Sequence, residues 1–156
     1  MASFHLAVKA IGRSAGRSAT AAAAYRAGVE ITDERTGLVH DYTRKQGVEH
    51  SELVLPAAAP EWAGDRERLW NAAELAEVRK NATVAREYEI ALPAELSAEA
   101  RRELALGLAR EISERHGVAV DVAIHAPGRE GDHRNHHAHL LTTTRRIGPE
   151  GLGVKT

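Results

Sequence analysis

The 156-residue chain contains no cysteine and few aromatic residues: one phenylalanine, two tryptophans and three tyrosines. Without cysteine it can form neither disulfides nor thiolate metal sites, so a metal ion would have to bind histidine and carboxylate side chains. The scarcity of aromatic rings limits stacking on nucleobases. No apolar run approaches the roughly 18 residues that a membrane helix needs. The N-terminal "MASFHLAVKA" lacks the basic region and long apolar core of a secretory signal, and we therefore expect a cytoplasmic protein.

An excess of charge of either sign is also missing. The net charge is −1 with histidine neutral, whereas nucleic-acid-binding domains are usually basic. Basic residues still gather locally in "GRSAGRS", "YTRKQG" and "TTTRR". The length suits one domain with one core, so we predict a single domain over residues 1–156. The glycine-rich end "GPEGLGVKT" shows no terminating element, which favours a longer natural protein.

Alternating apolar and polar residues predict strands at residues 3–9, 84–93, 118–126 and 136–146. Two short strands around the turn "DERTG" and an extended piece at "SELVLP" are also expected. Three of the main strands have one apolar face, and their other face carries small, polar or ionisable groups. The apolar faces consist of Phe4, Leu6 and Val8; Tyr88, Ile90 and Leu92; and Val118, Val120, Val122 and Ile124.

Three helices accompany these strands. An alanine-rich helix is predicted between the N-cap Ser18 and Gly28. A second, amphipathic helix is expected from Pro60 to about Lys80, with Leu75 among its apolar positions. The third covers residues 97–116, where four-residue spacing stacks Leu104, Leu108 and Ile112. One-sided strands and helices of this kind predict an α+β fold, an antiparallel sheet with helices packed mainly on one face. The uncovered face is then the expected site.

The stretch "HRNHHAHLL" places four histidines within seven residues. His137 and His139 project from one face of a strand, and His125 can join them from a neighbouring strand if "APGREGDHRN" is a hairpin connection. Three protein ligands leave positions open for water or a phosphate oxygen, which is typical of a catalytic metal site. We therefore predict that His125, His137 and His139 bind a metal ion, and that His133 and His136 lie at the rim.

Three acidic residues share the polar strand faces. Glu87 and Glu89 can form an ordinary solvated face, or one of them can orient a ligand imidazole or act as a general base. Asp121 lies on the same face as His125 and is a further candidate for that role.

The three tyrosines have different surroundings. Tyr88 lies on an apolar strand face, and Tyr42 lies in a polar turn. Tyr25 ends the alanine-rich helix, which follows two "GRS" units whose backbone N–H groups and guanidinium groups can hold phosphates. Tyr25 can fill the core or act as a nucleophile; as a nucleophile it would need a cation to polarise the phosphate.

Five separated motifs together resemble one known family: "FHLAVKAIGRSAGRSATAAAAYRAG", "DYTRKQGV", "ELVLP", "REYEIALP" and "HAPGREGDHRNHHAHLLTTTR". They are similar to conjugative relaxases of the MobA/MobL class, particularly the TraA-type N-terminal domain, in the HUH endonuclease superfamily. The resemblance implies a five-stranded antiparallel sheet with helices. It also implies nicking and religation of one DNA strand at a plasmid transfer origin through a 5′-phosphotyrosine.

The resemblance further implies roles for single residues. Tyr25 would be the nucleophile, and His125, His137 and His139 would hold Mg²⁺ or Mn²⁺, with other transition ions possible in vitro. Glu87 and Glu89 match the acidic strand segment. The expected partners are single-stranded origin DNA with a hairpin and a nick site, accessory relaxosome proteins and a type IV secretion coupling protein. Candidates to line the path of the DNA strand are Arg13, Arg17, Arg44, Lys45, Arg134, Arg145 and Arg146.

Two other functions suit the same residues. One is a metal-dependent phosphoesterase that attacks with metal-bound water and forms no covalent intermediate. The other is a non-catalytic DNA-binding module that the metal ion only stabilises.

Overall fold

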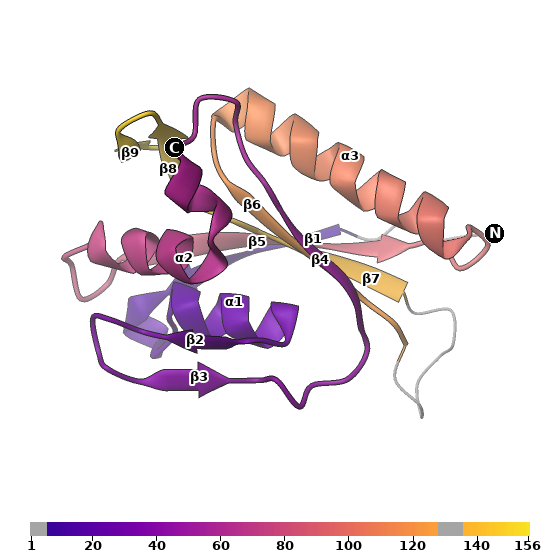
Figure 1. Cartoon of the computed structure of the whole chain (residues 1–156), viewed down its shortest axis with the longest axis horizontal. Coiled ribbons are helices and arrows are strands. Elements are labelled where there is room, and N and C mark those ends of the chain that lie inside the picture. The colour runs from indigo at the N-terminus through magenta and orange to yellow at the C-terminus, as the bar shows by residue number, and fades with distance from the viewer. Residues whose placement is uncertain (1–5, 128–135) are drawn as a thin grey trace.

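The computed structural model describes residues 6–127 and 136–156 and has an α+β fold (Figure 1). Its centre is a five-stranded antiparallel sheet in the order β1-β5-β7-β6-β4. The strands are β1 (Leu6–Gly12), β4 (Val48–Val54), β5 (Thr83–Leu92), β6 (Val120–His125) and β7 (His136–Thr142). The predicted fold class and sheet are therefore confirmed. Phe4, His133 and Arg134 lie outside the described residues.

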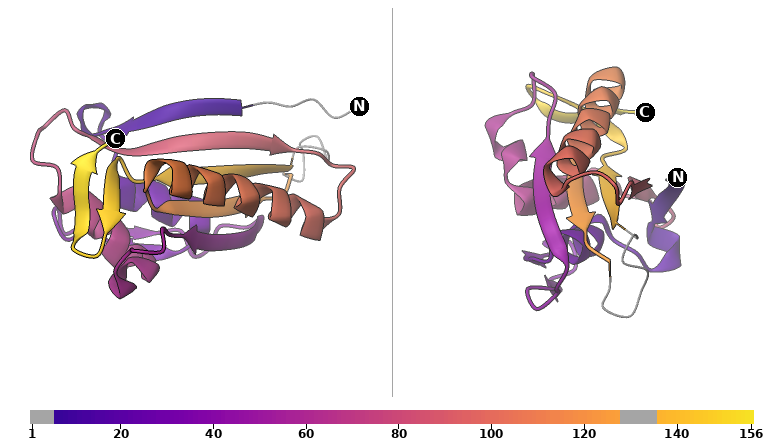
Figure 2. Two further views of the ribbon diagram at one scale, coloured as in Figure 1. Left: turned by 90° about the horizontal axis from the view of Figure 1, so that it is seen from above. Right: turned by 90° about the vertical axis from the view of Figure 1, so that its right-hand side faces the viewer.

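Helices cover both faces of this sheet (Figures 1 and 2). Helix α3 (Ala98–His116) lies on one face, over a core that includes Val120, Val122 and Leu140. Helices α1 (Ala19–Ala27) and α2 (Arg66–Leu75) lie on the other, with Ala85, Ala119 and Leu141 in their core. Helices α1 and α2 therefore cover the polar strand face, which was expected to be free of helices. The expectation of a helix-free site face is wrong, because small residues such as Ala119 let an alanine-rich helix pack closely there.

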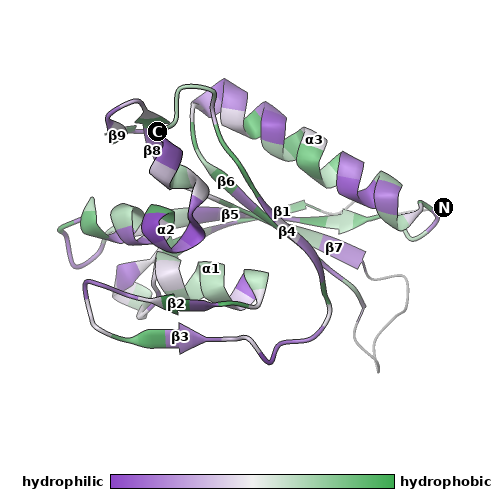
Figure 3. Cartoon of the chain, viewed as in Figure 1, coloured by the Kyte–Doolittle hydropathy of each residue, from purple (hydrophilic) through white to green (hydrophobic). Residues whose placement is uncertain are grey.

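The predicted helix boundaries are confirmed for α1 and α3. Ser18 Oγ accepts a hydrogen bond from the Ala21 N–H at 3.1 Å, and Gly28 ends α1 with φ 69°. In α3, Ser97 is the N-cap and accepts a hydrogen bond from the Ala100 N–H, and Gly117 ends the helix with φ 68°. The predicted apolar side of α3 is confirmed in part, because Leu108 and Ile112 pack against the core whereas Leu104 is 40% exposed. Ala105, Leu106 and Ala109 are the buried residues of this helix face. Figure 3 shows hydrophobic and hydrophilic stretches alternating along α3.

The second predicted helix is shorter than expected. A 3₁₀ turn, η2 (Glu61–Gly64), precedes α2, and the helix ends at Leu75, whose side chain is 54% exposed. The chain leaves the helix here, and Glu77 forms ion pairs with Arg145 at 2.6 Å and Lys155 at 3.0 Å. These ion pairs hold Glu77 beside the C-terminal strands that carry Arg145 and Lys155, two residues beyond the end of the helix.

Strand β1 lies at an edge of the sheet. Leu6 and Val8, predicted to be core residues, are 48% and 53% exposed. They do lie on the α3 side, because Leu6 pairs with Ile90 and Val8 with Tyr88 in the ladder. Since α3 packs mainly against β6 and β4, it leaves β1 uncovered.

Two small hairpins complete the fold. Strands β2 (Glu30–Thr32) and β3 (Val39–Asp41) form the hairpin predicted around "DERTG". Strands β8 (Arg145–Gly148) and β9 (Gly151–Lys155) form a hairpin that the sequence pattern did not predict. It is anchored to the end of α3, where the Ile147 N–H donates to the Gly117 carbonyl at 2.8 Å. Among the helices of the described residues, none combines the length and apolar character needed to span a membrane.

Candidate functional site

Three histidines converge at one end of the sheet, as predicted. His125 ends β6 and lies opposite His137 of β7, with His139 two residues further along that strand. The ring centroids are 4.6 to 5.4 Å apart. One nitrogen from each ring lies within 4.8 Å of the others, so the three imidazoles could hold one metal ion. The register of two neighbouring strands produces this arrangement, because residues two apart on a strand share a face.

Glu87 supports this cluster from β5. It is 1% exposed, and its Oε1 accepts a hydrogen bond from His139 Nδ1 at 2.5 Å. Its other oxygen accepts from the Arg26 guanidinium. Burial alone would raise the pKa of Glu87, but the bonds from His139 and Arg26 outweigh it and lower the pKa to about 2. Glu87 is thus a charged acceptor for His139 Nδ1, and His139 Nε2 takes no part in this hydrogen bond.

Glu89 lies on the same face as Glu87 and is more exposed. Its side chain is 32% exposed, and one carboxylate oxygen lies 3.6 Å from Lys9 Nζ. Oxygens of Glu87 and Glu89 also lie within 4.8 Å of a His139 nitrogen. This second group could therefore offer carboxylate oxygens to a metal ion beside the imidazoles.

His125 is held by the end of α1. Its Nε2 lies 2.8 Å from the carbonyl oxygen of Arg26. Burial lowers the pKa of His125 to about 4, and nearby positive charge at His139, Lys45 and His137 contributes, against the hydrogen bond to Arg26. The imidazole is therefore neutral near pH 7, the state in which histidine binds metal.

Tyr25 lies in the last turn of α1, and its side chain is 49% exposed. The ring of Tyr42 meets it edge-on at 5.2 Å between centroids, and Lys45 Nζ lies 3.4 Å from its ring centre. Tyr25 is thus not a core residue. Together with Arg17, Arg26 and residues of the β2–β3 hairpin, it lines a groove along α1.

Asp121 does not belong to this site. Arg66 binds both of its carboxylate oxygens, at 2.8 and 2.9 Å, and Trp70 Nε1 donates to one of them at 2.9 Å. The predicted role beside His125 is wrong, because four residues along a strand carry Asp121 away from the imidazoles and under α2.

The predicted DNA-contacting residues divide into two groups. Arg13 and Arg145 are occupied within the fold, Arg13 by Glu74 and Arg145 by Glu77. Arg146 lies against Gly117, at the opposite end of β6 from His125. These three are therefore poor candidates. Arg17 and Arg44 are exposed, and Lys45 lies over the Tyr25 ring.

Arg26 is the site residue that the sequence pattern missed. Its carbonyl accepts from His125, and its side chain pairs with Glu87. Its position directly after Tyr25 was the available signal. However, neither of its partners could be identified from spacing along the chain.

The chain matches known proteins over nearly its whole length. A model of the MobA/MobL family matches residues 17–156. The mobilization protein MobL of Acidithiobacillus ferridurans is 51% identical over 177 aligned positions, covering 99% of this chain and 46% of the relative. The conjugal transfer protein TraA of Rhizobium radiobacter is 39% identical, covering 99% of this chain and 14% of the relative. The chain thus spans less than half the length of either relative.

The fold also has a solved counterpart. A structure described as the molecular basis of vancomycin resistance transfer in Staphylococcus aureus superposes with a TM-score of 0.87 at 36% identity. The superposition covers 97% of this chain and 75% of the other. Taken with the family match over residues 17–156, these similarities show that the chain belongs to the MobA/MobL family.

Proposed function

We propose that residues 1–156 form a relaxase domain of the HUH type, which nicks one strand of DNA at a plasmid transfer origin and later rejoins it. Family membership supports this proposal, as do relatives whose names refer to mobilization and conjugal transfer. Its substrate is single-stranded origin DNA that carries a hairpin and a nick site. Accessory relaxosome proteins and a type IV secretion coupling protein are the proposed partners of the whole protein.

The observation that carries the proposal is the connection between Tyr25 and the histidine cluster. Tyr25 is half-exposed, and the carbonyl of the next residue, Arg26, accepts a hydrogen bond from His125. The residue after this solvent-accessible phenol therefore contacts His125, one of three imidazoles that could hold a cation. A phenol near neutral pH needs such a cation to attack phosphorus.

In the proposed reaction Tyr25 Oη forms a bond to the phosphorus of one phosphodiester. The bond from phosphorus to the 3′ oxygen breaks, and that oxygen gains a proton while the phenol loses one. The product is a 5′-phosphotyrosine, and the reverse reaction rejoins the strand. A divalent ion held by His125, His137 and His139 would supply electrophilic stabilisation of the phosphate charge.

The two glutamates have separate proposed roles. Glu87 keeps His139 oriented through its 2.5 Å hydrogen bond. Glu89 is the more solvent-accessible carboxylate of the pair, so we assign it to proton transfer. Mg²⁺ prefers oxygen ligands, while imidazoles suit Mn²⁺, Zn²⁺, Co²⁺ and Ni²⁺. We propose Mg²⁺ or Mn²⁺ as the ion used in the cell and expect the others to bind in vitro.

The DNA strand is proposed to pass the exposed end of α1. Arg17 lines the groove beside Tyr25, and Lys45 brings an ammonium group to the Tyr25 ring. Arg44 and Arg134 remain further candidates. Phosphate contacts of this kind position a strand without reading its sequence.

A covalent-adduct assay tests the function. The protein is incubated with Mn²⁺ and a single-stranded oligonucleotide that spans the origin hairpin and nick site, and products are separated on a denaturing gel. The wild type is expected to yield a nicked strand and a protein–DNA adduct. Tyr25→Phe should abolish both, whereas Tyr88→Phe, on the α3 side of the sheet, should not.

An adduct formed by Tyr25→Phe would refute the assignment of the nucleophile. Cleavage without an adduct, unaffected by Tyr25→Phe, would instead identify a phosphoesterase that uses metal-bound water. Binding without any cleavage would identify a DNA-binding module.

A further inference from the structure

Arg26 is linked to the histidine cluster in two ways: its main-chain carbonyl accepts from His125, and its side chain pairs with Glu87, which binds His139. It lies in the last turn of α1, directly after Tyr25, and its side chain is 16% exposed. We propose that Arg26 is a positioning residue that couples metal binding at the three histidines to the placement of Tyr25. This inference rests on the proposed function, because it gives Tyr25 and the histidines the roles assigned above.

The main-chain contact determines how His125 can bind an ion. A carbonyl oxygen can only accept a hydrogen bond, so His125 Nε2 must carry the proton in its 2.8 Å contact with Arg26. The lone pair of a neutral His125 is then on Nδ1, where it can bind a cation. The end of α1 thus sets the tautomer of this imidazole.

The side-chain contact reaches His139 through Glu87. The Arg26 guanidinium pairs with one carboxylate oxygen of Glu87, and the other oxygen accepts from His139 Nδ1 at 2.5 Å. This leaves His139 Nε2 available to a cation. Carboxylates that orient a ligand imidazole in this way typically change metal affinity 10- to 100-fold when they are altered.

Arg26 is also held to its own helix. Its Nη1 donates to the Ala22 carbonyl, one turn earlier in α1, at 3.0 Å. The guanidinium therefore moves with the end of α1, as the Tyr25 backbone does. A displacement of this turn would disturb two of the three proposed ligands together, and an ion bound to them would in turn restrain the turn that carries Tyr25. Such coupling is reciprocal by thermodynamic necessity.

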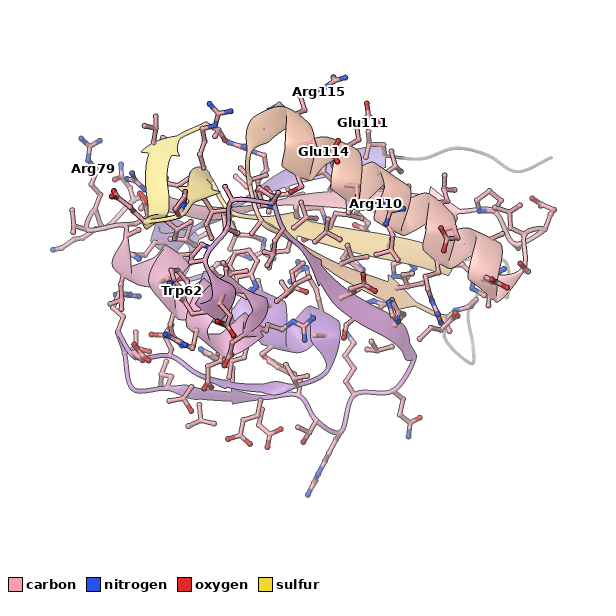
Figure 4. All side chains as sticks on the ribbon, turned by 45° about the horizontal axis from the view of Figure 1, so that its top comes forward. Trp62, Arg79, Arg110, Glu111, Glu114 and Arg115 are labelled. Atoms are coloured by element: carbon pink, nitrogen blue, oxygen red, sulfur yellow. The ribbon has the colours of Figure 1, made fainter. Side chains whose placement is uncertain are left out.

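The test is the Mn²⁺ affinity of the protein without DNA, measured by titration calorimetry. Arg26→Met removes the charge and the donors but keeps much of the apolar stem, and we expect Mn²⁺ to bind about 10- to 100-fold more weakly. Arg26→Lys keeps one charged donor group and should recover part of the loss. The matched control is Arg110→Met, on the exposed surface of α3 (Figure 4), which should bind Mn²⁺ like the wild type.

A double-mutant cycle separates this role from a general loss of stability. If Arg26 acts through Glu87, then Arg26→Met combined with Glu87→Gln should lose much less affinity than the sum of the two single losses. Circular dichroism melting of each variant identifies any that are unfolded at the temperature of the titration. If Arg26→Met is unfolded, the Mn²⁺ affinity of Arg26→Lys, which keeps the side-chain length and charge, is compared with that of the wild type instead.

Three results would overturn the proposal: a folded Arg26 variant with wild-type Mn²⁺ affinity, additive losses in the cycle, or no Mn²⁺ binding by the wild type. These measurements test Mn²⁺ binding without DNA and involve no nicking. A failure of the adduct assay would therefore be distinguishable from a failure of this inference. In the adduct assay, the Mn²⁺ concentration for half-maximal adduct should rise in Arg26→Met by the factor that calorimetry gives.

Discussion

Two buried acids on the same face of the sheet, Glu87 on β5 and Asp121 on β6, are each paired with an arginine from a helix above them. Glu87 meets Arg26 of α1, and Asp121 meets Arg66 of α2. The third partner differs. Asp121 also accepts a hydrogen bond from the Trp70 indole inside the core, whereas Glu87 accepts one from His139 Nδ1.

This difference shows how one kind of ion pair can serve two purposes. The Asp121 group is closed, because every partner belongs to the packing of α2 on the sheet. The Glu87 group is open, because a nitrogen of its partner His139 lies within 4.8 Å of nitrogens of His125 and His137. Substitutions should distinguish the Asp121–Arg66 pair, which stabilises the fold, from the Glu87–Arg26 pair, which also supports the proposed metal site. The largest expected effect comes first.

Asp121→Asn should destabilise the fold strongly and leave the metal site intact. It removes the negative charge that balances Arg66, whose side chain is only 19% exposed. Breaking such a buried pair typically costs about 3–5 kcal/mol. Urea unfolding should show this loss, while the Mn²⁺ affinity of the folded protein stays close to that of the wild type.

The matched control for Asp121→Asn is Glu111→Gln, which removes an exposed pair with Arg115 on α3 and should cost under about 1 kcal/mol. Weakened Mn²⁺ binding by a stable Asp121→Asn variant would contradict the separation of the two groups.

Acid should destabilise the metal-free protein through His125. Its pKa is lowered from 6.5 to about 4, so between these values the unfolded chain binds more protons than the folded one. The stability contributed by neutral His125 is then present above pH 6.5 and lost as the pH falls toward 4, by up to about 3 kcal/mol. Urea unfolding at a series of pH values measures it.

His125→Gln cannot take up this proton and should flatten the pH dependence in that range. An equally steep dependence in His125→Gln would assign the effect to another group.

Glu87→Gln, unlike Asp121→Asn, should weaken the proposed metal site as well as the fold, because Glu87 is buried beside Arg26 as Asp121 is beside Arg66. The amide can still accept from Arg26, but it no longer supplies a charged acceptor to His139 Nδ1. We expect Mn²⁺ affinity to fall about 10- to 100-fold. Calorimetry with Asp121→Asn as the comparison distinguishes the two acids, and equal Mn²⁺ affinity of Glu87→Gln and wild type would remove Glu87 from the site.

Lys45→Met should have the smallest effect. If this ammonium contacts a phosphate, affinity for single-stranded DNA should fall a few-fold at low salt, and the salt dependence should decrease by about one unit. Fluorescence anisotropy with the origin oligonucleotide at several salt concentrations measures both. Lys80→Met, exposed in the loop before β5, is the control and should match the wild type.

Local patterns predicted which side chains share a strand face better than they predicted what packs against each strand. Alternation correctly put His137 and His139 on one face, because side chains on a strand alternate regardless of what packs on them. The same pattern made Leu6 and Val8 core residues, and it was wrong because alternation does not reveal that β1 lies at an edge. The ion pairs of Arg13 and Arg145 were likewise not predictable, since the buried acids that bind them lie more than 60 residues away in the chain.

The amino-acid sequence by itself determined which residues could form the site: the strand faces that carry Glu87, His125, His137 and His139, and the helix whose last turn carries Tyr25 before Gly28. Strand periodicity and helix caps act over a few residues, so they can be identified without the fold. Only the tertiary structure decided that Glu87 meets His139 while Asp121 meets Trp70, and that Arg26 joins the two ends of the site. Both acids have the same local pattern, and their roles differ because different helices pack above them.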